Sequence, residues 1–304
     1  MISEEETFGG TWPFKARYSS AAGFRQHYVD EGPRDGEVVV CLHGEPTWGY
    51  LYRNFIPALS QHYRVIVPDH MGFGKSETPQ DREYTLRTHV ENLSALITDL
   101  GLGNISFVAQ DWGGLMSGAY AIRFPAKVRR LCLLNTLLGY GGAQVVQERS
   151  EWFAWIAKHY EAGTLEGLLG ELGSTVLSAM KITGFQNSAA VDDEWIRAYS
   201  APFPDRGSCK GAIEFPLDFH LGRFRKYLME GVATGNLEAL KRKPAMLAVG
   251  MQDRAIHPQN QIADFQSLFP SGPITCLPNA GHYCQEDAPE LLVALVHQFM
   301  QMNR

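Results

Sequence analysis

The fold is decided by residues 105–114, which read Ile-Ser-Phe-Val-Ala-Gln-Asp-Trp-Gly-Gly. The first five are mostly apolar and do not alternate with polar residues, which predicts a strand covered on both faces. Small residues at positions 109, 113 and 114 allow a sharp turn from this strand into a helix, so that the side chain of Asp111 projects above the sheet. Taken alone, the segment is equally consistent with an aspartate that only caps the helix.

Five further runs have the same apolar character and predict the other strands of one sheet. They are residues 38–42, 65–67, 131–134, 246–249 and 274–277. Between them lie segments with helical spacing, including one that ends before Gly101 and a last helix that begins at residues 287–289 and runs to about Met302. Strands that alternate with helices predict an α/β fold with a mostly parallel sheet flanked by helices.

The alternation stops between residues 137 and 220. Residues 151–160 and 165–180 have helical patterns, and no strand-like run occurs before Pro244. We expect an inserted helical cap over residues 138–217, within an α/β core formed by residues 1–137 and 218–304.

The composition excludes several classes of protein. The chain has 27 Lys and Arg against 33 Asp and Glu and no basic stripe, so no nucleic-acid partner is expected. The acidic N-terminus and the absence of an apolar run of about 18 residues predict a soluble, cytoplasmic protein that does not bind a membrane. The five cysteines lack C-x-x-C spacing and are expected to be reduced core residues. The histidines lack paired ligand spacing, so no metal is expected.

A loop that suits an oxyanion hole follows the first of these strands. Residues 43–48 read His-Gly-Glu-Pro-Thr-Trp and come directly after the run 38–42. The backbone N–H groups of Glu45 and of Trp112, which follows Asp111, would together form such a hole. The His-Gly pair is a weak signal by itself and gains its weight from the turn at Asp111.

Two further polar residues follow strands at the edge of the sheet where working residues of parallel sheets gather. Asp253 comes after the run 246–249, and His282 comes after the run 274–277. The chain order Asp111, Asp253, His282 is that of a nucleophile, an acid and a histidine. Each alone is also an ordinary turn or helix-start residue, but three at the correct strand ends predict a catalytic triad.

An aspartate in the nucleophile position selects the chemistry. A serine that attacked a saturated carbon would form an ether that water cannot reopen, whereas a carboxylate forms an ester that water can attack. Asp111 therefore predicts cleavage of a bond between a saturated carbon and a halogen or an epoxide oxygen. His282 would take a proton from the hydrolytic water, and Asp253 would orient its ring.

These motifs resemble the haloalkane dehalogenases over nearly the whole chain. The resemblance implies an α/β-hydrolase fold with a helical cap, and hydrolysis of a haloalkane to a primary alcohol and halide without a cofactor or metal. It rests on residues 43–48, 110–114, 250–253, 280–282 and the cap stretch 201–205 (Ala-Pro-Phe-Pro-Asp).

The departing halide needs N–H donors in a dry pocket. The resemblance implies that the Trp112 indole supplies one. Glu45 stands where many family members carry an asparagine donor, and a carboxylate there would repel a halide. The second donor is therefore expected from the cap. Trp155 occupies the position expected in the subfamily with Glu in this loop, Trp152 is the nearer rival, and packing of cap against core is the alternative for both. That subfamily also carries its acid at the position of Asp253.

Further apolar residues are expected near the pocket by their position in or beside the cap, with core packing as the equal alternative. They are Trp152, Phe153, Phe203, Phe215, Leu217 and Phe224. The expected partners are a small apolar halogenated substrate and the halide product, and a monomer is favoured.

Two related enzymes remain open. An epoxide hydrolase would share Asp111 and His282 and would need cap tyrosines, for which Tyr140, Tyr160, Tyr199 and Tyr227 are available. A β-lactone decarboxylase of olefin biosynthesis resembles the same motifs, although such enzymes generally carry the Asn form of the loop. A non-catalytic receptor on the same scaffold would have no need of the acid, the base and the oxyanion loop together.

Overall fold

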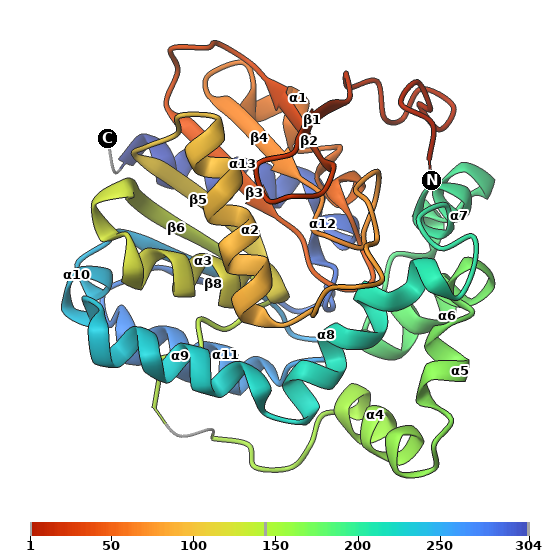
Figure 1. The fold of residues 1–304 in the computed structure, drawn as a ribbon. Coiled ribbons are helices and arrows are strands. Elements are labelled where there is room, and N and C mark those ends of the chain that lie inside the picture. The colour runs from red at the N-terminus through yellow and green to blue at the C-terminus, as the bar shows by residue number, and fades with distance from the viewer. Residues whose placement is uncertain (1, 143–144, 303–304) are drawn as a thin grey trace.

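The computed structural model describes residues 2–142 and 145–302 and contains one eight-stranded sheet (Figure 1). Its strand order is β1-β2-β4-β3-β5-β6-β7-β8, in which β2 pairs antiparallel with both β1 and β4 and all the other pairs are parallel. The strands are β1 (Arg17–Ser19), β2 (Gln26–Glu31), β3 (Val38–Leu42), β4 (Arg64–Pro68), β5 (Ile105–Gln110), β6 (Val128–Leu134), β7 (Ala245–Gly250) and β8 (Ile274–Leu277).

The six strands predicted from apolar runs are confirmed, whereas β1 and β2 were not predicted. β2 is buried, but its sequence Gln-His-Tyr-Val-Asp-Glu is polar. Its buried polar side chains have partners: His27 Nδ1 lies 2.8 Å from Asp69 Oδ2, and Asp30 accepts a hydrogen bond of 3.1 Å from Arg64. A strand that buries paired polar groups has no apolar pattern to reveal it.

The register brings the carboxyl ends of the central strands to one level. Leu42 of β3 pairs with Ala109 of β5, and Gln110 of β5 pairs with Leu134 of β6. The loops that follow these strands therefore meet at one edge of the sheet.

Helices cover both faces of the sheet (Figure 1), with α2 and α3 on one face and α13, which packs against α1, on the other. The α-helices are α1 (Ile56–Leu59), α2 (Leu86–Asp99), α3 (Trp112–Arg123), α4 (Glu151–Glu161), α5 (Leu165–Leu169), α6 (Leu172–Thr183), α7 (Asp193–Ser200), α8 (Lys210–His220), α9 (Arg223–Thr234), α10 (Leu237–Lys241), α11 (Pro258–Leu268), α12 (Cys284–Asp287) and α13 (Pro289–Met302). Four short 3₁₀ helices are η1 (Gly49–Tyr52), η2 (Pro125–Lys127), η3 (Ser188–Ala190) and η4 (Gly207–Cys209). Within the described residues, none of the helices is long and apolar enough to cross a membrane.

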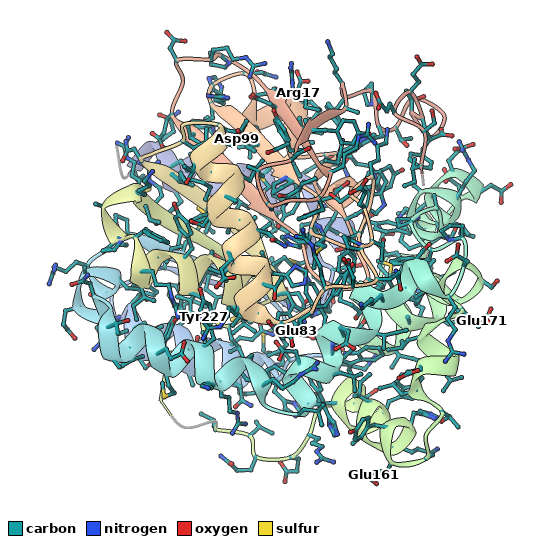
Figure 2. The ribbon with its side chains drawn as sticks, in the orientation of Figure 1. Arg17, Glu83, Asp99, Glu161, Glu171 and Tyr227 are labelled. Carbon is teal, nitrogen blue, oxygen red and sulfur yellow. The ribbon has the colours of Figure 1, made fainter. Side chains whose placement is uncertain are left out.

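The segment between β6 and β7 is helical, and α4 to α7 lie together beside the core (Figure 1). Glu161, at the end of α4, and Glu171, before α6, are exposed and carry labels in Figure 2. The helical pattern over residues 165–180 is divided into α5 and α6, because α5 ends at Gly170. The boundary expected after residue 217 falls inside α8.

One cysteine departs from the expectation of core burial. Cys41, Cys132, Cys209 and Cys284 are buried, but Cys276 is exposed. Cys276 belongs to β8, which is the last strand of the sheet and has one neighbour only. An edge strand is less covered than a central one, so its apolar run did not imply full burial.

Candidate active site

Asp111 lies at the turn between β5 and α3 with a φ of +51° and a ψ of −123°. This conformation is costly for a residue with a side chain and occurs mainly where function requires it. Asp111 occupies the N-cap position of α3, but its side chain makes no capping hydrogen bond. The structure therefore favours the projecting side chain over the helix cap.

Close approach at this turn explains two neighbouring glycines. A Cβ atom on Gly113 would lie 2.3 Å from the carbonyl oxygen of Leu42, and one on Gly44 would lie 2.1 Å from Asp111 Oδ1. Any side chain at either position would displace the turn or the carboxylate.

His282 lies between two carboxylates. Its Nε2 atom is 3.3 Å from Asp111 Oδ2, and its Nδ1 atom is 3.0 Å from Asp253 Oδ2. The structure thus brings together the three residues that the strand ends predicted, in a linear arrangement of carboxylate, imidazole and carboxylate. Burial lowers the pKa of His282, but the charges of Asp253 and Asp111 and their hydrogen bonds outweigh it and raise the pKa to about 10.

Asp253 is fixed by donors on both of its oxygens. Oδ1 accepts from the backbone N–H groups of Ala255 and Ile256 at 2.8 and 2.9 Å. Oδ2 accepts from the side-chain amides of Asn135 and Gln261, each at 2.8 Å, besides facing His282. This leaves the carboxylate one orientation, which sets that of the imidazole ring.

Asn135 is a site residue that sequence reasoning missed. It directly follows β6. Its amide oxygen accepts from Gly250 N at 2.8 Å while its amide nitrogen donates to Asp253. The available signal was its place after a central strand, where a polar residue meets the other strand ends.

Glu45 places two groups at the site: its backbone N–H and its buried side-chain carboxyl group. Its N–H donates to Asp111 Oδ1 at 3.0 Å, as expected for one half of an oxyanion hole. Its side chain is only 5% exposed, and within the described residues Oε1 has no hydrogen-bond partner. Burial and the charge of Asp111 raise the pKa of this carboxyl well above its ordinary value. The surroundings of this carboxyl therefore favour its uncharged form more than those of an exposed glutamate do.

Three more polar residues support the site and carried no sequence signal. Gln110 donates from its amide to the carbonyl oxygen of His282 at 3.2 Å. Tyr283 donates to the carbonyl oxygen of Glu45 at 3.3 Å and accepts from Thr183 of α6 at 2.8 Å. These bonds connect the loop of Glu45 to the helical segment, which only the folded chain reveals.

Trp112 is buried directly after Asp111, and its ring stacks on Phe215 of α8 with a centroid distance of 4.5 Å and an interplanar angle of 18°. Trp152 and Trp155 lie on α4 and stack on each other at 5.3 Å. Trp152 is buried, and its backbone N–H donates to the carbonyl oxygen of Arg254, next to Asp253. Trp155 is half-buried and also stacks on His159. Because Trp152 is more buried than Trp155, it remains the alternative candidate for the second halide donor.

The other apolar candidates form two groups. Phe203 and Leu217 are buried, and Phe203 lies edge-on to Phe73, which contacts Phe215. Phe153 and Phe224 each stack on the ring of Phe219, with centroid distances of 4.4 and 4.8 Å. Phe153 lines a cavity of about 230 Å³ and Phe224 one of about 430 Å³, both of which also border Leu137.

The four cap tyrosines have different surroundings, and the hydroxyl of Tyr140 is buried without a hydrogen-bond partner among the described residues. Tyr199 donates to the buried carboxylate of Glu286, and Tyr160 is 44% exposed. The ring of Tyr227, labelled in Figure 2, lies under the guanidinium groups of Arg87 and Arg123. The charge of Arg123 also acts on Tyr140. None of the four makes a hydrogen bond to Asp111 within the described residues.

Known proteins share this architecture over the whole chain. Residues 37–289 match the model of the alpha/beta hydrolase fold family. The chain is 33% identical to a cis-3-alkyl-4-alkyloxetan-2-one decarboxylase from Xanthomonas campestris pv. campestris, over 92% of this chain and 94% of that protein. It is 32% identical to a haloalkane dehalogenase from Psychrobacter cryohalolentis, over 94% and 90%.

Solved structures of haloalkane dehalogenases have the same fold as this chain. The haloalkane dehalogenase DpaA from Paraglaciecola agarilytica NO2, described as tetrameric, superposes with a TM-score of 0.77 at 28% identity and covers 97% of this chain and 96% of its own. A variant of the haloalkane dehalogenase DatA from Agrobacterium tumefaciens C58 superposes with a TM-score of 0.79 at 25% identity, over 94% of this chain and 96% of its own.

In the described part of the chain, no group of three or more His, Cys, Asp or Glu is arranged to hold a metal ion. By its sheet, its strand-end residues and these relatives, the chain belongs to the alpha/beta hydrolase fold family.

Proposed function

We propose that the protein hydrolyses haloalkanes to a primary alcohol and halide through an ester on Asp111. The observation that supports this proposal is the pair of contacts that the Asp111 carboxylate makes. Its Oδ1 accepts a hydrogen bond from the N–H of Glu45, while its Oδ2 faces Nε2 of His282. An aspartate placed in this way is suited to attack a saturated carbon and then to be released by water.

In the first step, Oδ2 attacks the carbon that bears the halogen. A carbon–oxygen bond forms, and the carbon–halogen bond breaks with its electron pair leaving on the halide. The Trp112 indole and a cap indole, Trp155 in our proposal, donate N–H groups to the halide as its charge grows. The walls of the pocket include Phe215, which packs on Trp112.

In the second step, His282 takes a proton from water, and the water oxygen attacks Cγ of Asp111. The charge develops on Oδ1, beside the N–H of Glu45 and, in our proposal, that of Trp112. Collapse restores the carboxylate: the alkoxide takes the proton held by His282 and leaves as the alcohol, and the remaining proton of the attacking water passes to His282. One halide and one proton are released for each haloalkane and water consumed.

The helical residues 138–217 would act in this proposal as the lid that keeps the site dry. The expected monomer stays a proposal, because a structural relative is tetrameric. Light scattering would measure the mass in solution.

The test is halide release from a panel of short bromo- and chloroalkanes, with Asp111→Asn as the matched inactive control. Added bromide should quench the tryptophan fluorescence of the wild type. A protein that released no halide from any member of the panel, but opened an epoxide, would contradict the proposal.

A β-lactone decarboxylase is the second candidate, and the relatives at 33% and 30% identity that carry this name favour it. A cis-3,4-dialkyloxetan-2-one would then yield an alkene and carbon dioxide, which gas chromatography detects. Alkene formation without halide release from bromoalkanes would select this function instead.

A further inference from the structure

A cavity of about 750 Å³ lies at the edge of the sheet opposite to Asp111. It is bordered by Ala245, the first residue of β7, whereas the far end of that strand leads to Asp253. Its walls are mostly apolar and come from the last strands and α13. They include Pro244, Met246, Phe269, Pro273, Leu295 and Phe299. The volume is within the range of sites for small organic ligands.

The rim of this cavity is basic. Lys241, Arg242 and Lys243 all border it, and no acidic side chain does so among the described residues. Lys241 has a partner, since its Nζ lies 3.0 Å from Glu238 Oε1. Arg242 and Lys243 form no ion pair with any residue in the ranges that the structure describes.

The electrostatic surroundings of Lys243 would favour a bound anion. Burial and the neighbouring charge of Arg242 lower the pKa of Lys243 below its ordinary value, with no carboxylate to oppose them. Two adjacent cations without counter-charges therefore stand beside an apolar wall. A bound carboxylate would neutralise them and an attached alkyl chain would cover the wall.

We infer that this cavity binds a free amphiphilic monoanion, an unbranched alkanoate of medium chain length, with its carboxylate on Arg242 and Lys243 and its chain along Met246, Leu295 and Phe299. Two cations are too few for a nucleic acid, and the cavity offers a wall for one chain. This inference is independent of the reaction at Asp111, because the cavity lies at the other end of the strands.

Isothermal titration calorimetry with decanoate, below the concentration at which it forms micelles, tests the inference. The double variant Arg242→Gln/Lys243→Gln should weaken binding by about tenfold or more, because it removes both charge-assisted contacts. The matched control Lys241→Gln removes a neighbouring cation that already has a partner and should leave the affinity unchanged within about twofold. Leu295→Trp, which fills the cavity and keeps both cations, should also weaken binding.

Three further arms make the outcome decisive. Decan-1-ol, which has the same chain and no charge, should bind more weakly than decanoate. Thermal melts establish whether each variant is folded. If the double variant does not fold, Leu295→Trp provides the test. Equal binding by the wild type and both cavity variants would overturn the inference. Binding to vesicles of anionic or zwitterionic lipid without binding to free decanoate would also overturn it.

Discussion

Nε2 of His282 lies 3.3 Å from Oδ2 of Asp111. This contact gives the imidazole two successive states in the proposed reaction. In the free protein, the two carboxylates raise the pKa of His282 to about 10, so the ring is a cation at neutral pH. Once Asp111 is an ester, its negative charge is gone and one cause of the raised pKa is removed. The pKa of the ring then falls, and the proposed reaction requires the ring to lose its proton before it acts as a base.

Replacing His282 should stop the reaction after its first step. In His282→Gln, Asp111 still attacks the substrate, but no base activates the water. Mass spectrometry after incubation with a bromoalkane should show one alkyl group on a peptide that contains Asp111, with one halide released for each protein molecule. Consumption of substrate without an adduct at that residue would show that the covalent route is wrong. Asp111→Asn is the control that should give neither adduct nor halide.

The change in His282 predicts the time at which protons are released. If the imidazolium deprotonates when the ester forms, a proton should appear together with the halide in the first turnover. Stopped-flow measurement with a pH indicator in weak buffer should show a proton burst of about one per active site in the wild type. His282→Gln should release halide without this burst. Proton release only at the slower rate of alcohol formation would contradict the assignment.

The sequence predicted the parts of the fold in which a residue pattern is consistent with only one structure. Buried parallel strands such as β5 must be apolar on both faces, and the polar residue after each such strand must lie at the shared edge. That reasoning placed Asp111, Asp253 and His282 correctly relative to one another. It failed for β2, whose buried side chains His27 and Asp30 are polar and paired.

Residues that act through others escaped prediction for a related reason. Asn135 orients Asp253, and Tyr283 supports the carbonyl of Glu45, but each makes its contact with a residue more than a hundred positions away. The ionisation state of Glu45 depends on burial beside Asp111, and no local pattern encodes that burial. The sequence alone therefore assigned to Glu45 the charge of an exposed glutamate.

The two stacked indoles of α4 differ in a way that binding can measure. In Trp155→Phe, the proposed second N–H donor is lost while an aromatic ring remains, so bromide should bind about tenfold more weakly. Trp152→Phe is the matched control, because it replaces the other indole of the same stacked pair, and it should change bromide binding much less. Fluorescence quenching by bromide gives both constants. The reverse order of effects would assign the halide to Trp152, whose side chain is the more buried of the two.

Glu45 predicts a dependence of stability on pH that an amide would abolish. The pKa of its carboxyl is raised in the folded protein, so between the ordinary pKa of a glutamate and the raised value the folded state holds a proton that the unfolded state has lost. The free energy of unfolding of the wild type therefore falls as the pH rises through that window. Gln at this position is neutral at every pH, keeps the backbone N–H that contacts Asp111, and has nearly the same shape.

Thermal melts should accordingly show Glu45→Gln as stable as the wild type near pH 4, and increasingly more stable than the wild type as the pH rises towards 8. The exposed Glu161→Gln is the control, in which the difference from the wild type should not change with pH. Halide release at neutral pH should survive in Glu45→Gln, because glutamine keeps the backbone N–H that contacts Asp111 and carries no charge. A variant that was less stable at pH 8 than at pH 4, each relative to the wild type, would show that Glu45 is ionised in the folded protein and is held by a cation.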